Sequence, residues 1–155
     1  MTDTVPPEKR SEIMSRIRST NTKPEMVVRK MLHAAGYRYR LHRKDLPGKP
    51  DIVLPKYQAV IFVNGCFWHH HEGCRIAATP KSNAEFWLSK LSKNVERDQK
   101  NSERLRSDGW RVLVIWECAC RQVHNKQTLL KKMLSFINTS QPNYGEIGAN
   151  DLGRT

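Results

Sequence analysis

The sequence predicts an α/β domain built on a mixed β-sheet, and three observations lead to this fold class. Residues 51–54 and 58–63 are short apolar runs separated by a turn that begins with a proline, which is typical of a β-hairpin. The nearly uninterrupted apolar run 110–116 is typical of a central strand covered on both faces. Residues 82–107 have the spacing of a long amphipathic helix. A strand–helix–strand unit makes a right-handed crossover and a parallel strand pair, so the sheet combines a hairpin with parallel strands.

The chain has 155 residues, which is the size of one domain and allows about 70% of the unfolded chain's surface to be buried. We expect one domain over residues 1–138, with residues 1–6 as a flexible arm. Residues 139–155 are rich in Gly, Asn and Ser, and we expect this tail to be disordered.

The formal net charge is +12 and the pI is near 9.9. Such a surface favours a polyanionic partner, and nucleic acid is a better candidate than anionic lipid because no long apolar or membrane-surface segment is present. The N-terminus lacks the apolar core of a signal peptide, so we expect a cytoplasmic protein that is nucleoid-associated when it binds DNA. Four cysteines in a reducing compartment indicate metal binding before disulfides.

A first short helix is expected to begin at Pro6-Pro7 and to end near Arg16. Ile13 and Ile17 lie four residues apart on one face, with Met14 beside them. On periodicity alone, ordinary packing within the protein accounts for Met14.

A second helix is expected over residues 24–35, with Thr20 or Thr22 as its cap and Gly36 at its end. Glu25 lies in its first turn, where a carboxylate suits the helix dipole. Residues 37–42 alternate between apolar and basic side chains and predict a strand.

The long helix is expected to begin at a capping box formed by Ser82 and Glu85 and to end near Ser107. Its apolar face comprises Leu88, Leu91, Val95 and Leu105. Its basic stripe includes Lys90, Lys93 and Arg97, which can be a solvated face or a set of phosphate contacts. A last amphipathic helix is expected over residues 129–137.

A candidate metal centre follows the expected strand 58–63. Cys66, His71 and Cys74 have the local spacing of a zinc site, and Cys118, just after the apolar run 110–116, is the candidate fourth ligand. A zinc ion held by these four residues would tie two strand ends together. Phe67 and Trp68 stand between ligands, where they can pack over the metal or be presented to a partner.

A second candidate site consists of carboxylates. Asp51 begins an apolar strand, and it would lie near the end of the next strand and near Glu25 if the second helix packs beside it. Carboxylates that converge beside a backbone carbonyl suit Mg²⁺. On a basic surface, such a site indicates metal-assisted phosphodiester hydrolysis. A histidine can take the proton of the attacking water, and the spacing leaves both His69 and His70 as candidates.

Four motifs together resemble one family, the very-short-patch-repair (Vsr) DNA mismatch endonucleases. They are Leu46-Pro-Gly-Lys-Pro-Asp-Ile-Val53, Asn64-Gly-Cys-Phe-Trp-His-His-His71, Lys93-Asn-Val-Glu-Arg-Asp98 and Gly109-Trp-Arg-Val-Leu-Val-Ile-Trp-Glu-Cys118. The similarity extends from about residue 10 to residue 137. It implies a restriction-endonuclease-like three-layer fold. It also implies an enzyme that nicks duplex DNA 5′ to the thymine of a T:G mismatch left by 5-methylcytosine deamination, with Mg²⁺ as the catalytic ion and Zn²⁺ as a structural ion.

The resemblance also implies roles for individual residues. Asp51 matches the catalytic magnesium ligand, Val63 contributes a backbone carbonyl to the ion, Glu25 matches a supporting acid and His69 matches the general base. Cys66, His71, Cys74 and Cys118 match the zinc ligands. Met14, Phe67 and Trp68 match the residues that wedge between base pairs.

The sequence departs from the family's pattern near the catalytic residues. Val63 replaces a threonine, which a backbone contact tolerates. Asn64 replaces a histidine that assists catalysis, and asparagine cannot carry a proton at neutral pH. Glu72-Gly73 is a local variation between two of the zinc ligands.

Three other classes of protein share some of these features. A zinc-stapled DNA-binding module would leave Asp51 and Glu25 without a role, and a zinc hydrolase would need an open coordination position. A related nuclease for another mismatch or lesion is the remaining alternative. The partner implied by the resemblance is double-stranded DNA with a T:G mismatch. We expect a monomer that works with mismatch-repair proteins.

Overall fold

The structure, a computed structural model, describes residues 21–74, 77–78, 80–121 and 126–152. The expected N-terminal helix and Met14 lie outside the described residues. Five strands form one sheet in the order β1-β2-β3-β4-β5. The first three strands are antiparallel neighbours, whereas β3, β4 and β5 are parallel, so the predicted mixed sheet is confirmed. The strands are β1 (Arg40–Leu41), β2 (Ile52–Leu54), β3 (Ala59–Asn64), β4 (Arg111–Trp116) and β5 (Tyr144–Ile147).

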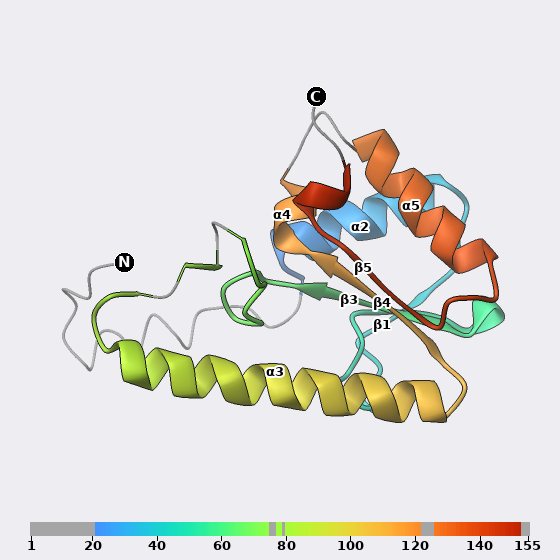
Figure 1. The fold of residues 1–155 in the computed structure, drawn as a ribbon. Coiled ribbons are helices and arrows are strands. Elements are labelled where there is room, and N and C mark those ends of the chain that lie inside the picture. The colour runs from blue at the N-terminus through green and yellow to red at the C-terminus, as the bar shows by residue number, and fades with distance from the viewer. Residues whose placement is uncertain (1–20, 75–76, 79, 122–125, 153–155) are drawn as a thin grey trace.

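The helices lie on both faces of this sheet (Figure 1). The long helix α3 (Ala84–Ser107) crosses one face and supplies the connection from β3 to β4. The opposite face carries α2 (Lys23–Ala34), the short α4 (Glu117–Cys120) and α5 (Lys126–Asn138). Two short 3₁₀ helices complete the described elements, η1 (Pro55–Tyr57) in the β2–β3 hairpin and η4 (Ala149–Leu152) after β5.

Alternate residues of the central strands fill two separate cores, because successive side chains of a strand point to opposite faces. Ile52, Ile61 and Leu113 pack with α2 and α5 in the larger core. Val60 and Val112 pack with the C-terminal part of α3 in the smaller one. The central strands β3 and β4 are buried by both layers, as their apolar sequences predict.

The expectation that residues 139–155 are disordered is wrong for the part that the structure describes, residues 139–152. Residues 144–147 form β5, which pairs in parallel with β4, and η4 follows. Ile147 and Leu152 are buried there, with 4% and 6% of their surfaces exposed. The polar composition of the tail suggested disorder. However, the backbone N–H and C=O groups at the edge of β4 form hydrogen bonds with this segment, and its two apolar side chains are buried in the protein.

Three other local expectations are also wrong. The capping box does not form, because Asn83 in a left-handed conformation (φ 56°) precedes α3 without a side-chain cap. Trp87 is the buried residue in the first turns of α3, whereas Leu88 is 52% exposed. The large indole packs against the loop after β3, and this tertiary contact sets which face of the helix turns inward. The strand expected over 37–42 is reduced to Arg40–Leu41.

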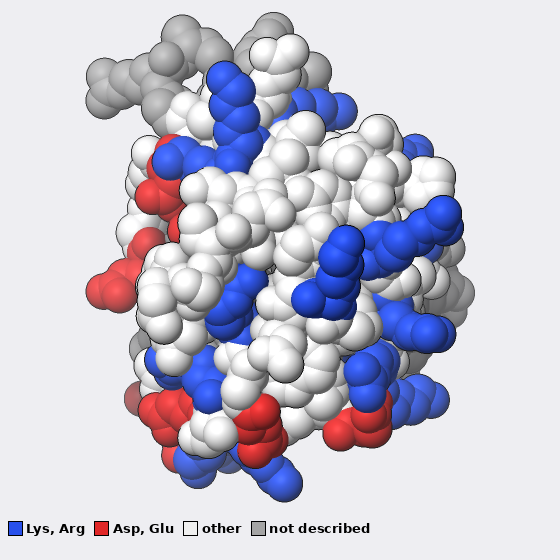
Figure 2. Space-filling view, turned by 90° about the vertical axis from the view of Figure 1, so that its right-hand side faces the viewer, with Lys and Arg blue, Asp and Glu red and all other residues white. Residues whose placement is uncertain are grey.

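Positive charge is spread widely over the molecule. Figure 2 shows the face at the right of Figure 1, where Lys and Arg side chains are scattered across the surface and Asp and Glu gather toward its lower and left edges. Among the described helices, none combines the length and the apolar character needed to cross a lipid bilayer.

Candidate active site and metal centre

The four expected zinc ligands meet at one end of the parallel strands. One ligand atom from each of Cys66, His71, Cys74 and Cys118 lies within 4.8 Å of the other three. Cys66 follows β3 and Cys118 lies in α4 directly after β4, and the neighbouring pair Asn64 and Trp116 closes the ladder between these strands. Three sulfur atoms and one imidazole nitrogen are a closed donor set that suits tetrahedral Zn²⁺, so the residues present fit this ion.

The thiols of this cluster interact with one another. The pKa of Cys118 is lowered to about 5, first by the hydrogen bond from Cys66 and then by the backbone N–H of Ala149 and the nearby His71. The same contact with Cys118, together with burial, raises the pKa of Cys66. Cys120 stands apart from the four ligands in the larger core, where burial raises its pKa to about 12.

The C-terminal segment covers this centre. The N–H of Ala149 donates to Sγ of Cys118 at 3.2 Å. Gly148 lies against His71 so closely that an added Cβ would stand 2.9 Å from Cε1 of the imidazole. His71 stacks on Trp116 with ring centres 4.2 Å apart, and the indole N–H of Trp116 donates to Glu146. The sequence offered no sign of these contacts because the segment reads as polar and irregular.

Asp51, Glu25 and His42 form a second group of converging ligand atoms, again within 4.8 Å of one another. Asp51 lies directly before β2, and its Oδ2 accepts a hydrogen bond from the backbone N–H of Val63 at 2.8 Å. Glu25 is only 1% exposed on α2, and its Oε2 lies 2.8 Å from Nε2 of His42. The predicted proximity of Asp51, Glu25 and the end of β3 is confirmed, whereas His42 was not singled out in the sequence.

The pKa of Asp51 is raised to about 7. Burial is the main cause that raises its pKa from 3.8 to about 7, and the Glu25 carboxylate raises it further, against the opposing hydrogen bond from Val63. Two carboxylates this close, one buried and one half-buried, repel each other when both are ionised. A divalent cation between them would remove that repulsion, and carboxylate oxygens are the donors that Mg²⁺ requires, so this group also fits an ion.

These residues lie at a cleft of about 890 Å³. Asp51, Val63, Asn64 and His69 line it together with the basic side chains of Lys44, Lys49, Lys90 and Arg97. Lys93 is exposed on α3 outside the cleft wall. Acidic groups at the bottom and cations on the walls suit a bound phosphodiester.

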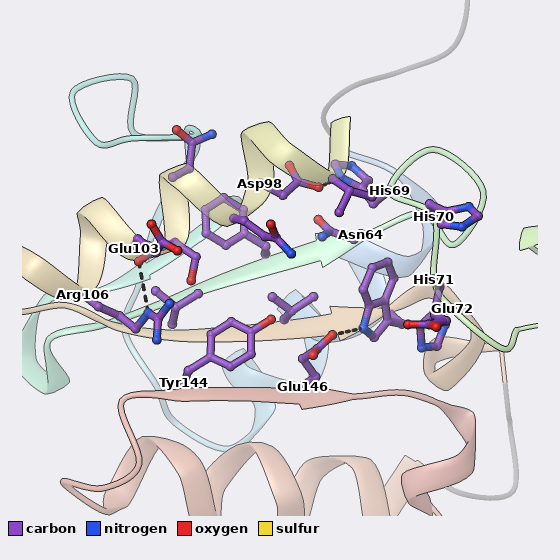
Figure 3. A pocket seen from close by; sticks show the side chains of 18 of the residues that line it. Asn64, His69, His70, His71, Glu72, Asp98, Glu103, Arg106, Tyr144 and Glu146 are labelled. Atoms are coloured by element: carbon purple, nitrogen blue, oxygen red, sulfur yellow. Dashed lines mark hydrogen bonds and ion pairs between the residues drawn. The ribbon is translucent and has the colours of Figure 1, made fainter. Parts of the chain in front are cut away.

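His69 is held in the cleft by a carboxylate on α3. Its Nδ1 lies 2.6 Å from Oδ2 of Asp98, which comes from the motif 93–98. Figure 3 shows this pair on the wall of a second pocket of about 800 Å³ between α3 and the sheet, with Asn64 beside it. His70 lines that second pocket and does not line the cleft of Asp51. The sequence left both histidines open, and their surroundings distinguish them.

The aromatic residues between the expected zinc ligands belong to a larger cluster. Phe67 and Trp68 make edge-to-face contacts with each other at 5.1 Å, and both contact Trp87 of α3 at 5.3 and 5.9 Å. Phe86, 54% exposed, extends the cluster to the surface. Nζ of Lys90 lies 5.9 Å from the ring of Trp68. Trp87 was missed in the sequence because the helical pattern was assigned to Leu88.

Comparisons with known proteins find relatives over most of this chain. The family described as DNA mismatch endonuclease Vsr matches residues 2–75. The type II nicking enzyme V.XorIIP of Xanthomonas oryzae pv. oryzae is 49% identical over 134 residues, which cover 86% of this chain and 98% of that protein. V.NmeAIP of Neisseria meningitidis, also a type II nicking enzyme, is 52% identical over 76% of this chain and 84% of its own length. The DNA mismatch endonuclease Vsr of Escherichia coli K12 is 46% identical over 72% of this chain and 71% of its length.

Proposed function

This chain belongs to the Vsr family and is a DNA mismatch endonuclease, and on that basis we propose that it nicks double-stranded DNA 5′ to the thymine of T:G mismatches. Such mismatches arise when 5-methylcytosine is deaminated, and the nick initiates very short patch repair. The observation that carries the proposal is the cleft that Asp51 and His69 line together with basic side chains.

The proposed catalytic ion is Mg²⁺, held by a carboxylate oxygen of Asp51 and by the backbone carbonyl of Val63. Glu25 supports the ion from its buried position beside Asp51. When bound, the ion would hold the scissile phosphate, lower the pKa of a water molecule and stabilise the leaving oxygen. The backbone N–H of Val63 donates to one oxygen of Asp51 and so fixes the orientation of its carboxylate.

His69 is the proposed general base. The Asp98 carboxylate accepts the Nδ1 proton of His69, and this fixes the tautomer in which Nε2 is free to take a proton. Asn64 lies beside the pair, where it can donate to a phosphate oxygen but cannot move a proton. The proton transfer therefore rests on His69 and Asp98 in this chain.

The Cys66, His71, Cys74 and Cys118 cluster is proposed to hold a structural Zn²⁺. That ion would lock the loop after β3 to α4 and so fix the position of His69, Phe67 and Trp68. A closed four-residue donor set leaves no position for a catalytic water, which favours a structural role over a zinc hydrolase.

Phe67 and Trp68, with Trp87 behind them, are the proposed wedge that recognises the mismatch. Opening a base step costs a few kcal/mol, and least where pairing is already defective. Phosphate contacts from Lys90, Lys93 and Arg97 position the duplex but carry no sequence information. Met14 is proposed to approach from the other groove.

We further propose that the architecture is restriction-endonuclease-like, with helices on both faces of the mixed sheet as its support. The enzyme is proposed to act as a monomer in the cytoplasm, bound to the nucleoid, with mismatch-repair proteins as further partners. Residues 1–138 carry the nuclease residues in this proposal, and β5 adds the C-terminal edge of the sheet.

A nicking assay tests the function directly. Duplexes of one sequence, either matched or with a T:G, A:C or U:G pair, are labelled on each strand and incubated with zinc-loaded protein and Mg²⁺. We expect cleavage of the thymine strand of the T:G duplex only, and none with Asp51→Ala. Equal cleavage of the matched duplex would contradict mismatch recognition, and preferred cleavage of another pair would assign the enzyme to that lesion.

A further inference from the structure

His42 has no role in the mechanism above, yet its side chain lies in the catalytic cleft. It directly follows β1, and its backbone N–H donates to the carbonyl oxygen of Asp51 at 3.1 Å. Its backbone has a positive φ of 48°, a conformation that non-glycine residues seldom adopt. The β1–β2 pairing and this turn together hold the imidazole beside Asp51 and Glu25.

The ligand atoms of this group lie close enough together for a small adjustment of the side chains to place them around one ion. In an octahedral site with bonds of about 2.1 Å, adjacent ligand atoms lie about 3 Å apart and opposite ones about 4.2 Å apart. Nε2 of His42 lies 2.8 Å from Oε2 of Glu25, and one ligand atom from each of the three residues falls within 4.8 Å of the others. A cation bound between these side chains would take the place of the hydrogen bond between His42 and Glu25.

We propose that Nε2 of His42 is a direct ligand of the catalytic ion, together with Asp51 and Glu25, so that the site binds a first-row transition ion such as Mn²⁺ more tightly than Mg²⁺. Mg²⁺ takes oxygen ligands almost exclusively, whereas an imidazole nitrogen strengthens the binding of first-row transition ions. The inference rests on the proposed nuclease site and adds one ligand and a metal preference to it. Mg²⁺ still binds through the carboxylates, and His42 contributes little to its affinity.

The alternative role for His42 is to position Glu25 by a hydrogen bond. His42→Gln separates the two roles, because a glutamine amide can still donate to Glu25 but offers no nitrogen lone pair to a metal. His33→Gln is the matched control, since His33 is exposed near the end of α2 and is absent from the cleft wall. Both variants are prepared with the Cys/His centre loaded with zinc, so that added Mn²⁺ reports on the other site alone.

Binding of Mn²⁺ is followed by loss of the free-ion EPR signal, and electron spin-echo modulation then reports any directly coordinated ¹⁴N. For the wild type and His33→Gln we expect ¹⁴N modulation and at least tenfold tighter binding of Mn²⁺ than of Mg²⁺ in competition. For His42→Gln we expect no ¹⁴N modulation, at least a tenfold loss of Mn²⁺ affinity and less than a threefold change for Mg²⁺. Absence of modulation in the wild type, or equal losses for both ions, would overturn the proposal.

Asp51→Asn separates this inference from the proposed function. Loss of Mn²⁺ binding and of nicking in that variant, without ¹⁴N modulation in the wild type, would refute only the role of His42. Nicking that survives Asp51→Asn would refute the nuclease site itself.

Discussion

At the scale of single residues, Asp51 makes the stability of the protein depend on pH. Its folded-state pKa is about 7 against 3.8, so the folded protein holds this proton more tightly than the unfolded chain does. The stabilising contribution is fully present below about pH 4 and is lost as the pH rises to about 7. The change corresponds to a few kcal/mol at most.

We therefore expect the melting temperature of zinc-loaded protein, without added Mg²⁺ or Mn²⁺, to fall between pH 5 and pH 8 through this residue. Asp51→Asn should make the melting temperature nearly independent of pH over this range and should raise it at pH 8. Adding a divalent ion to the wild type should also raise the melting temperature at pH 8. Asp108→Asn, on the exposed end of α3, is the control. An unchanged profile in Asp51→Asn would show that the carboxyl group is ionised throughout.

A second residue-scale prediction concerns His69 and Asp98. His69→Ala should bind mismatched DNA and fail to nick, because the proposed base is removed while the phosphate contacts remain. Asp98→Asn should lower kcat by about 10- to 1000-fold with little change in KM, since a wrongly oriented imidazole loses the 10²–10⁴-fold effect of a general base only in part. Single-turnover nicking measures both variants. His70→Ala should keep most of its activity, and an inactive His70→Ala would reverse the assignment of the base.

At the scale of elements, the loop after β3 is stiffened from three sides. Cys66 and His71 belong to the metal cluster, the backbone carbonyl of Trp68 accepts a hydrogen bond from Asn94 of α3, and Trp87 packs beneath the aromatic pair. The loop can therefore present its aromatic side chains without reorganisation. Because these side chains are already ordered in the folded protein, little conformational entropy is lost when they bind DNA.

Trp68→Ala should accordingly lose selective binding of T:G duplexes far more than non-specific DNA affinity. The affinity ratio between T:G and matched duplexes, measured by competition at fixed salt, should fall at least tenfold, with zinc content and circular dichroism unchanged. Equal loss of matched and mismatched binding would assign Trp68 to packing over the metal centre. Trp110, directly before β4 and outside the cleft wall, supplies the control Trp110→Phe.

The β5–η4 segment is expected to retain the zinc ion. Ala149→Pro removes the N–H that donates to Cys118, and the first position of a helix tolerates proline. Ala149→Ser keeps that N–H and is the matched control. We expect zinc release to a chromogenic chelator to be at least fivefold faster in Ala149→Pro than in either Ala149→Ser or the wild type. Identical release rates would show that the segment merely covers the centre.

At the scale of the whole molecule, the proposed zinc ion connects the ends of the two central strands, β3 and β4. Metal binding then contributes to folding directly, on the order of 10 kcal/mol in small zinc domains. Cys118→Ala should lower the melting temperature by 10 °C or more and abolish activity. Cys120→Ala, which removes a thiol from the larger core without touching the metal, should cost only about 1 kcal/mol. A purified active protein without zinc by elemental analysis would refute the structural role.

The sequence by itself determined what depends on local order along the chain. The apolar runs 51–54, 58–63 and 110–116 predicted the central strands. The short turn between the first two runs predicted an antiparallel hairpin, and the long helix between 58–63 and 110–116 predicted a parallel pair. The structure confirms both pairings. The spacing of Cys66, His71 and Cys74, with Cys118 after the next strand, was enough to predict a four-residue cluster. These features are readable because strand period, helix period and ligand spacing are properties of neighbouring residues.

Only the tertiary structure decided the partners that lie far apart in the chain. His42 reaches Glu25 across 17 residues, Asp98 reaches His69 across 29, and Ala149 reaches Cys118 across 31. The local sequence around each of these residues predicts only an ordinary structural role, as a strand end, a helix surface or a polar tail. Their roles depend on the order of the strands and on the face that α3 turns to the sheet, which global packing sets and local periodicity does not encode.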